Sequence, residues 1–177
     1  LRPGHVRVQV RAEAMNHLDL WIRRGLPIDT TMPHIGGSDI AGLVMESAPD
    51  VEDWVPGTPV VINPILFCGR CEFCLQGEES LCRDFRILGE HTDGGFADEV
   101  VVPAYTLHQL PEDFPFELAA ALPVSYQTAW RALIHRAELR PGEDVLVLGA
   151  SGGTGMAAVQ VARLTGARAS AVTSGGE

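Results

Sequence analysis

Short runs of alternating apolar and polar residues fill most of the chain up to about residue 112, and this period of two is typical of half-buried strands. Val6, Val8 and Val10 alternate with arginine and glutamine in the first run. Further strands are predicted where similar runs lie between Gly/Pro turn signals, at 40–47, 58–67, 94–103 and 106–111. The first part of the chain is therefore predicted to be an all-β domain.

One helix interrupts this series of predicted strands. It covers 16–25, with Asn16 as the N-cap and Gly25 as the stop. A loop rich in proline and glycine is predicted to follow over 26–39.

The pattern changes near residues 113–120, where we place a domain boundary. Residues 114–137 are predicted to be helical, with an interruption at Pro123. A strand, a glycine-rich turn, a helix and a second strand at 168–173 follow. The first of these strands contains a continuous apolar run, Val145–Leu148, which is typical of a parallel strand covered on both faces.

Four cysteines form the strongest chemical signal in the chain. Two residues separate each of the first three from the next, and seven separate the last two, in the order Cys68, Cys71, Cys74 and Cys82. Four thiolates so close in sequence can surround one zinc ion and leave no open position for substrate, which favours a structural site. Free cysteines and an iron–sulfur cluster are the alternatives, although the ferredoxin pattern has a shorter last gap followed by proline.

The glycine-rich turn predicts binding of a dinucleotide. Backbone N–H groups at a helix start can bind a pyrophosphate, and glycines permit its close approach. Ala150 stands where the first glycine of the usual G-x-G-x-x-G pattern would be, so the strand before and the helix after the turn support the assignment. The turn residues expected to bind the cofactor are Ser151, Gly152, Gly153, Thr154 and Gly155.

The end of the second strand bears on the choice between the two dinucleotides. Sites that prefer NAD usually have an acidic residue there, whereas this chain has Thr173 and Ser174. These hydroxyls could bind a 2′-phosphate, which favours NADP(H) over NAD(H). A merely structural turn is the alternative interpretation.

Composition excludes several classes of partner. The net charge is −10 and the pI is about 5.0, so a nucleic acid or an anionic membrane is not expected as a partner. All 13 basic residues are arginine, so lysine catalysis is excluded within this stretch. No signal peptide is recognisable in this sequence, no apolar run is long enough to span a membrane, and the cysteines are clustered, so we expect a cytoplasmic location.

These features together resemble the medium-chain dehydrogenase/reductase family, which includes zinc-type alcohol dehydrogenases and quinone oxidoreductases. The motifs "NHLDLWIRRG", "GSDIAG", the cysteine lobe with "ILGEH", and "TAWRAL" carry the resemblance. It implies a mixed α/β fold: a GroES-like β-barrel domain over 1–116 with a zinc lobe at 67–84, then the start of a Rossmann doubly wound parallel sheet over 117–177. It also implies that His17 lies near the coenzyme phosphates and that Thr128 contacts the nicotinamide.

Zinc alcohol dehydrogenases of this family hold a second, catalytic zinc. By motif alignment its ligand positions are Asn16, Ser38 with Asp39, and about Val124. Only Asp39 is a good zinc ligand, so the resemblance is closer to the zinc-independent quinone and enone reductases. A different metal site that uses Asp39 with His17, His34 or His91 remains an alternative.

The expected function is hydride transfer between NAD(P)(H) and a small carbonyl, quinone or enone substrate. Asn16 is the candidate donor to the developing negative oxygen, with Asp39 beside it in the site; Tyr126 is a candidate proton donor or a core residue. A zinc-dependent alcohol dehydrogenase and a non-catalytic fragment or binding module are the alternatives. Because only two parallel strands are predicted, a partial Rossmann domain with low isolated activity is expected, and a homo-oligomer is expected for the full-length protein.

Overall fold

The computed structural model describes residues 1–25 and 32–175, in two compact units, Leu1–Pro123 and Val124–Glu177. Residues 26–31 of the predicted loop lie outside the described part of the chain. Among the described residues, no helix combines the length and the apolar character that crossing a bilayer requires.

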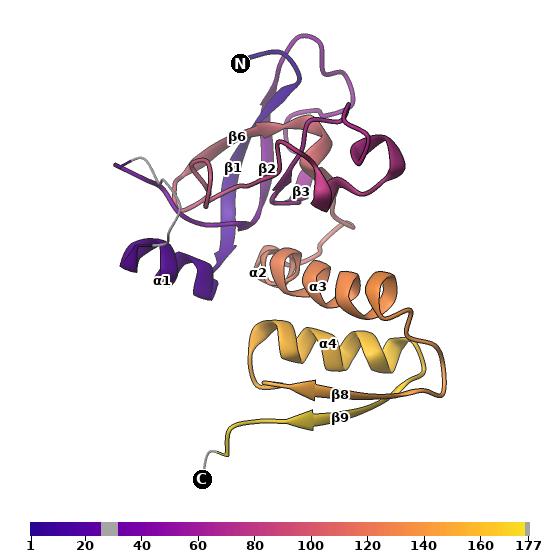
Figure 1. Cartoon of the computed structure of the whole chain (residues 1–177). Helices are drawn as coiled ribbons and strands as arrows, with labels where there is room; N and C mark the ends of the chain where they lie inside the picture. The colour runs from indigo at the N-terminus through magenta and orange to yellow at the C-terminus, as the bar shows by residue number, and fades with distance from the viewer. Residues whose placement is uncertain (26–31, 176–177) are drawn as a thin grey trace. The chain divides into compact units, whose positions relative to one another are not determined.

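A five-stranded antiparallel sheet with the order β6-β1-β2-β3-β7 forms the centre of the first unit (Figure 1). Its strands are β1 (His5–Ala14), β2 (Asp39–Ser47), β3 (Pro59–Ile62), β6 (Glu99–Pro103) and β7 (Leu107–Gln109). The consecutive strands β1, β2 and β3 are neighbours in the sheet, and the later strands β6 and β7 add to its two edges, beside β1 and β3. The end strands β6 and β7 are not paired with each other, so the predicted barrel is an open sheet in the described residues.

The alternating pattern of the first strand is explained by the core of this unit. Val6 and Val8 are fully buried, whereas Arg7 forms exposed ion pairs with Glu46 and Glu99 on the neighbouring strands. The buried side chains of β1 pack against those of β2, β3 and β6, in a cluster that includes Ile40, Val44, Val60, Ile62, Val100 and Val102. This side of the sheet therefore carries the main apolar core.

Two elements with partly buried faces lie beside the sheet. The helix α1 (His17–Arg24) begins at the N-cap Asn16 and ends at Gly25, as the sequence predicts. The short helix α2 (Phe116–Ala120) buries Ala119 and Ala120 against Ala41 of β2.

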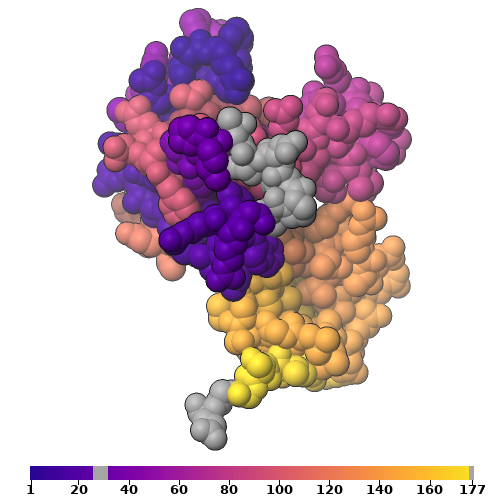
Figure 2. Space-filling model, turned by 60° about the vertical axis from the view of Figure 1, so that its left-hand side comes forward, coloured from indigo at the N-terminus to yellow at the C-terminus, as the bar shows by residue number. Residues whose placement is uncertain are grey.

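The cysteine lobe is built mainly from tight turns. Its elements are the strand pair β4 (Ile65–Leu66) and β5 (Arg86–Ile87), and two 3-10 helices, Cys74–Gln76 and Glu79–Leu81. In Figure 2 the magenta and pink residues of this segment gather into a lobe at the upper right of the view. The single strand predicted over 58–67 is thus divided into β3 and β4, because Pro64 follows β3 and cannot donate a ladder hydrogen bond.

The second unit contains the predicted strand–turn–helix–strand series. The strands β8 (Asp144–Leu148) and β9 (Arg168–Val172) are parallel, and α4 (Gly153–Leu164) connects them (Figure 1). The helix α3 (Pro123–Trp130) continues into a π-helical segment, Arg131–Arg136, and buries Ala129 against Ala157 and Val161 of α4.

The prediction that β8 is covered on both faces is wrong for this structure. Val147 is 7% exposed, but Leu146 and Leu148 are 63% and 72% exposed. Helix α4 packs on this two-stranded sheet from one side, so side chains that point to the other side remain in solvent in the described residues.

Candidate functional site

The four cysteines converge although Cys68 and Cys82 are 14 positions apart in the chain. Their sulfur atoms all lie within 4.8 Å of one another. The Sγ atoms of Cys68 and Cys74 are 3.9 Å apart, and those of Cys71 and Cys74 are 3.5 Å apart. Ligands at zinc–sulfur distances of about 2.3 Å in a tetrahedron are separated by about 3.8 Å. The geometry of the lobe therefore fits a zinc ion with four sulfur ligands.

Backbone N–H groups point at these sulfurs and favour their thiolate form. Cys82 Sγ accepts hydrogen bonds from the backbone N–H groups of Cys68 and Asp84, both at 3.3 Å. Backbone N–H groups of Cys74 and Arg83 lower the pKa of Cys71 to about 6. Those of Arg70 and Cys71 lower the pKa of Cys68.

The pKa of Cys74 shifts in the opposite direction, because burial and the neighbouring sulfur atoms both disfavour its thiolate. Burial, followed by its contacts with the sulfurs of Cys71 and Cys82, raises the pKa of Cys74 to about 12. A divalent cation among the sulfurs would neutralise this accumulation of charge and favour four thiolates. The donor chemistry of the lobe thus supports a metal centre.

A polar pair lies at the junction of β1, α1 and β2. The side-chain amide of Asn16 donates from Nδ2 to Oδ2 of Asp39 at 2.9 Å. Asp39 is 2% exposed and begins β2. Asp19 fixes the backbone beside this pair, because its carboxylate accepts from the N–H groups of Asn16 and Gly37 at 2.7 and 3.1 Å. Two sequence-predicted catalytic residues are thereby brought together.

This junction does not provide the donor set of a catalytic zinc. The hydroxyl of Ser38 is buried and donates to the carbonyl of Leu88 at 2.7 Å, and Val124 is apolar and belongs to the other compact unit. Asn16 turns its N–H, not a lone pair, toward Asp39. One carboxylate alone does not match the three protein ligands of such sites.

The alternative metal site with histidines is not formed in the described residues, where the cysteines are the one group with metal-binding geometry. His34 Nε2 bonds the carbonyl oxygen of Gly89 at 2.9 Å, and His91 Nδ1 accepts from the N–H of Ile87 at 3.1 Å. The ring of His17 lies 6.1 Å from that of Trp21, one turn later in α1. His34 and His91 therefore stabilise loop backbone through hydrogen bonds.

The glycine-rich turn lies between β8 and the start of α4, as predicted. Gly149 has a φ of 70°, and a Cβ on Gly155 would lie 2.2 Å from the carbonyl oxygen of Gly149. Only glycine permits this close packing of strand end and helix. Gly152 is the N-cap, and no side chain of the described residues caps this helix start. Its first N–H groups are thus suited to an anion.

The other residues predicted to bind the cofactor have exposed side chains. Thr173 and Ser174 directly follow the end of β9 and are exposed, and Thr128 is an exposed residue of α3. The structure also places Ser125 near the turn, since its Oγ would lie 2.8 Å from a Cβ on Gly153. Sequence reasoning missed this hydroxyl, because it comes from α3, an element that precedes the turn and has no sequence motif in common with it.

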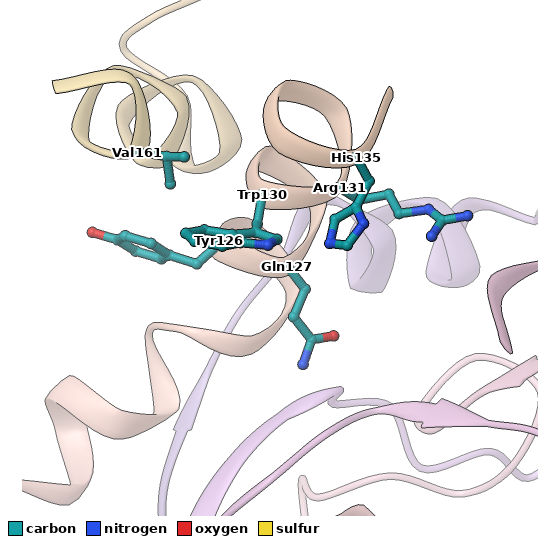
Figure 3. A pocket seen from close by; sticks show the side chains of 6 residues that line it. All are labelled: Tyr126, Gln127, Trp130, Arg131, His135 and Val161. Atoms are coloured by element: carbon teal, nitrogen blue, oxygen red, sulfur yellow. The ribbon is translucent and has the colours of Figure 1, made fainter. Parts of the chain in front are cut away.

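Tyr126 has a structural environment rather than one that marks a proton donor. Its hydroxyl donates to Gln160 Oε1 at 2.7 Å, and its ring packs against the core of the second unit. It lines an apolar pocket of about 360 Å³ on α3, its π-helical continuation and α4. Figure 3 shows the rings of Tyr126 and Trp130 on the side of α3 near Val161. Its catalytic role stays a prediction.

Glu13 is a second residue that sequence reasoning missed. It lies near the end of β1, and both of its carboxylate oxygens are buried without a hydrogen-bond partner among the described residues. Burial, followed by the charges of Asp19 and Asp39, raises the pKa of Glu13 to about 8.

Comparison with known proteins agrees with this fold and these motifs. Residues 2–112 match the family profile described as "Alcohol dehydrogenase GroES-like domain". A zinc-type alcohol dehydrogenase-like protein of Schizosaccharomyces pombe is 36% identical over 100% of this chain and 50% of its own length. An acryloyl-coenzyme A reductase of Metallosphaera sedula is 35% identical over 98% of the chain and 52% of its own length.

Solved structures give the same result. The crystal structure of an NAD-dependent alcohol dehydrogenase superimposes with a TM-score of 0.94 at 46% identity, over 98% of this chain and 51% of that one. The chain thus spans about half the length of the relatives it matches. With its open GroES-like sheet, cysteine lobe and glycine-rich turn, the chain belongs to the alcohol dehydrogenase group of the medium-chain dehydrogenase/reductase family.

Proposed function

We propose that the chain is the front part of an NAD(P)(H)-dependent oxidoreductase that reduces a conjugated carbonyl, an enone or a quinone, without a catalytic zinc. The observation that carries the proposal is the Asn16–Asp39 hydrogen bond of 2.9 Å at the positions of two zinc ligands. The name of the acryloyl-coenzyme A reductase relative supports this substrate class, because an acryloyl group is a conjugated carbonyl.

The cysteine lobe is proposed to hold a structural zinc. Four sulfurs within 4.8 Å of one another leave no open coordination position for a substrate. Cys68, Cys71, Cys74 and Cys82 would hold the ion, and it would stabilise the turns of the lobe.

A nicotinamide cofactor, when bound, would supply the hydride, and the residues of the chain would bind and orient the cofactor and the substrate. The N–H groups at the start of α4 are proposed to hold the pyrophosphate, with Gly152, Gly153 and Gly155 permitting its approach. His17 and Thr128 are proposed cofactor contacts on the basis of the family resemblance, together with the exposed hydroxyls of Ser151 and Thr154.

Asn16 is proposed to stabilise the oxygen that becomes negative when hydride adds to the far carbon of the conjugated system. A side-chain amide has two N–H groups. Asp39 accepts one of them, which orients the amide, and the other is the proposed donor to the substrate oxygen. Asp39 is in this account a positioning residue, and a conjugated substrate spreads the remaining charge over its own π-system.

Thr173 and Ser174 favour NADP(H), as stated above, whereas the name of one solved relative specifies NAD. Titration of each reduced cofactor against the tryptophan fluorescence of the chain measures the two dissociation constants separately. Tighter binding of NADPH supports the hydroxyl assignment, and tighter binding of NADH contradicts it.

The reaction itself is tested by following NADPH and NADH oxidation with a small enone, a quinone and a simple aldehyde. Reduction of the enone or quinone that persists after treatment with a chelator supports the proposal.

The zinc-type names of relatives favour one rival function, alcohol dehydrogenase activity. Oxidation of a simple alcohol that disappears when the metal is removed, while the fold persists, would establish this rival. A chain that binds neither cofactor would instead be a binding module or inactive fragment.

A further inference from the structure

The carboxyl group of Glu13 occupies space that two glycines leave free. A Cβ on Gly37 would lie 1.5 Å from Glu13 Oε1, and a Cβ on Gly95 would lie 3.1 Å from Oε2. Gly37 also has a φ of 98°, a backbone conformation that residues with a side chain rarely adopt. The carboxyl group is thus packed directly against backbone on two sides.

These two glycines belong to separate loops that cross at this point. The N–H groups of Gly94, Gly95 and Phe96 donate to the carbonyl oxygens of Ile35, Gly37 and Gly36, at 2.7, 3.0 and 3.1 Å. We call this contact of residues 35–38 with 94–96 the loop crossing. It leads directly into Asp39 at the start of β2, so it fixes where the Asn16–Asp39 pair lies.

The environment of the Glu13 carboxyl group disfavours its charged form. Both oxygens are buried and lack hydrogen-bond partners in the described residues. A buried carboxylate without a partner is costly. Burial raises the pKa of Glu13 most, and the charges of Asp19 of α1 and Asp39 of β2 raise it further. The two loops contribute glycine backbone and the side chain of Ile40 lies beside Gly95.

We propose that Glu13 is a positioning residue, held as a neutral carboxylic acid that fills the loop crossing, and that its ionisation loosens the crossing and the Asn16–Asp39 pair. Only the catalytic meaning of that pair rests on the proposed function. The sign follows from the folded-state pKa of about 8, which exceeds the ordinary value of 4.5. The folded chain keeps its proton longer than the unfolded chain, so stability falls as pH rises from about 4.5 to about 8.

The first test compares thermal unfolding of the chain with that of Glu13→Gln across this pH range. Glutamine keeps the size of the side chain and cannot ionise, so the variant should lose most of the pH dependence. At pH of about 8 it should unfold at least about 4 °C above the unmodified chain. Glu46→Gln, which alters an exposed carboxylate of β2, should keep the original pH dependence. If the unfolding temperature of Glu13→Gln changed with pH as much as that of the unmodified chain, the proposal would be overturned.

A second test does not depend on whether that variant folds. In the unmodified chain with ¹³C-labelled glutamate carboxyls, NMR should find one carboxyl that titrates near pH 8. The side-chain amide signals of Asn16 should shift over the same pH interval. Titration of every glutamate below about pH 6, or Asn16 signals that stay constant, would contradict the proposal. Neither readout involves cofactor or substrate, so failure of the proposed reaction would be recognised separately.

Discussion

Asn16 illustrates how one substituted position changes the chemistry a site can perform. Its amide cannot replace a zinc ligand, but it can donate hydrogen bonds, and Asp39 holds it in a defined orientation. Sequence alone identified both residues, because they lie in short motifs that align with the zinc ligands of the family. Their hydrogen bond could not be predicted, since it joins the N-cap of α1 to the start of β2, 23 residues apart.

Replacing Asn16 with alanine is expected to lower kcat for enone reduction by about 100-fold, with a small effect on KM. Loss of one donor to a developing oxyanion has an effect of this order. The measurement is steady-state NAD(P)H oxidation, with circular dichroism to verify folding. Gln109→Ala, which removes an exposed amide from β7, serves as the control and should keep the original rate. Unchanged kcat in Asn16→Ala would exclude the proposed role.

Glu13 shows a limit of sequence reasoning at the residue scale. On the alternating pattern of β1 it lies on the face opposite Val6 and Val8, which suggests an exposed side chain. It is covered because the loops at 35–38 and 94–96 fold over it. Burial by segments so distant in the chain leaves no periodic signal in the sequence.

At the scale of secondary-structure elements, the helices and strands with clear local sequence signals were predicted best. Helix α1 was predicted from its cap and stop, and both are confirmed. The continuation of α3 as a π-helix over Arg131–Arg136 was not predicted, because the hydrophobic pattern does not register a local change from the α to the π hydrogen-bond spacing. The strand predicted over 94–103 is shorter in the structure, because residues 94–96 belong to the loop crossing and β6 begins only at Glu99.

Gly94→Ala is expected to destabilise the chain by about 2–4 kcal/mol, because the loop crossing has no room for a methyl group. The new Cβ would lie 2.0 Å from the carbonyl oxygen of Gly37 and 2.6 Å from that of Gly36. Chemical denaturation measures the change in free energy of unfolding. Gly175→Ala adds the same methyl where nothing lies within 4 Å and should change it by less than about 0.5 kcal/mol. A similar small change for Gly94→Ala would show that the crossing is not tightly packed.

Cys74→Ser is expected to remove most of the bound zinc and to lower the unfolding temperature by more than about 5 °C, because metal binding contributes to the folding free energy of such lobes. Cys74 lies within 3.9 Å of the sulfurs of both Cys68 and Cys71, so its loss opens the ligand set. Zinc content per chain and thermal unfolding are the measurements. Ser80→Ala alters an exposed residue of the same lobe and should leave both unchanged. Full zinc retention in Cys74→Ser would rule out a four-cysteine site.

For the whole molecule, the sequence predicted two kinds of architecture in the right order, since strand periods and a strand–turn–helix signal are both local. The openness of the first sheet was not predicted. The exposure of Leu146 and Leu148 differs from what the apolar run of β8 suggests, but it agrees with the expectation of an incomplete Rossmann sheet. Both depend on which surfaces the remaining strands and helices cover, and no local pattern contains that information. The chain spans about half the length of its relatives, so the activity of the whole protein is a proposal.

We propose that this chain uses zinc to hold its cysteine lobe and not to activate a substrate. Elemental analysis combined with X-ray absorption at the zinc edge tests it most directly. We expect one zinc per chain, bound by four sulfur atoms at about 2.3 Å. A second zinc with nitrogen or oxygen ligands, or a chain that folds with no zinc, would contradict it.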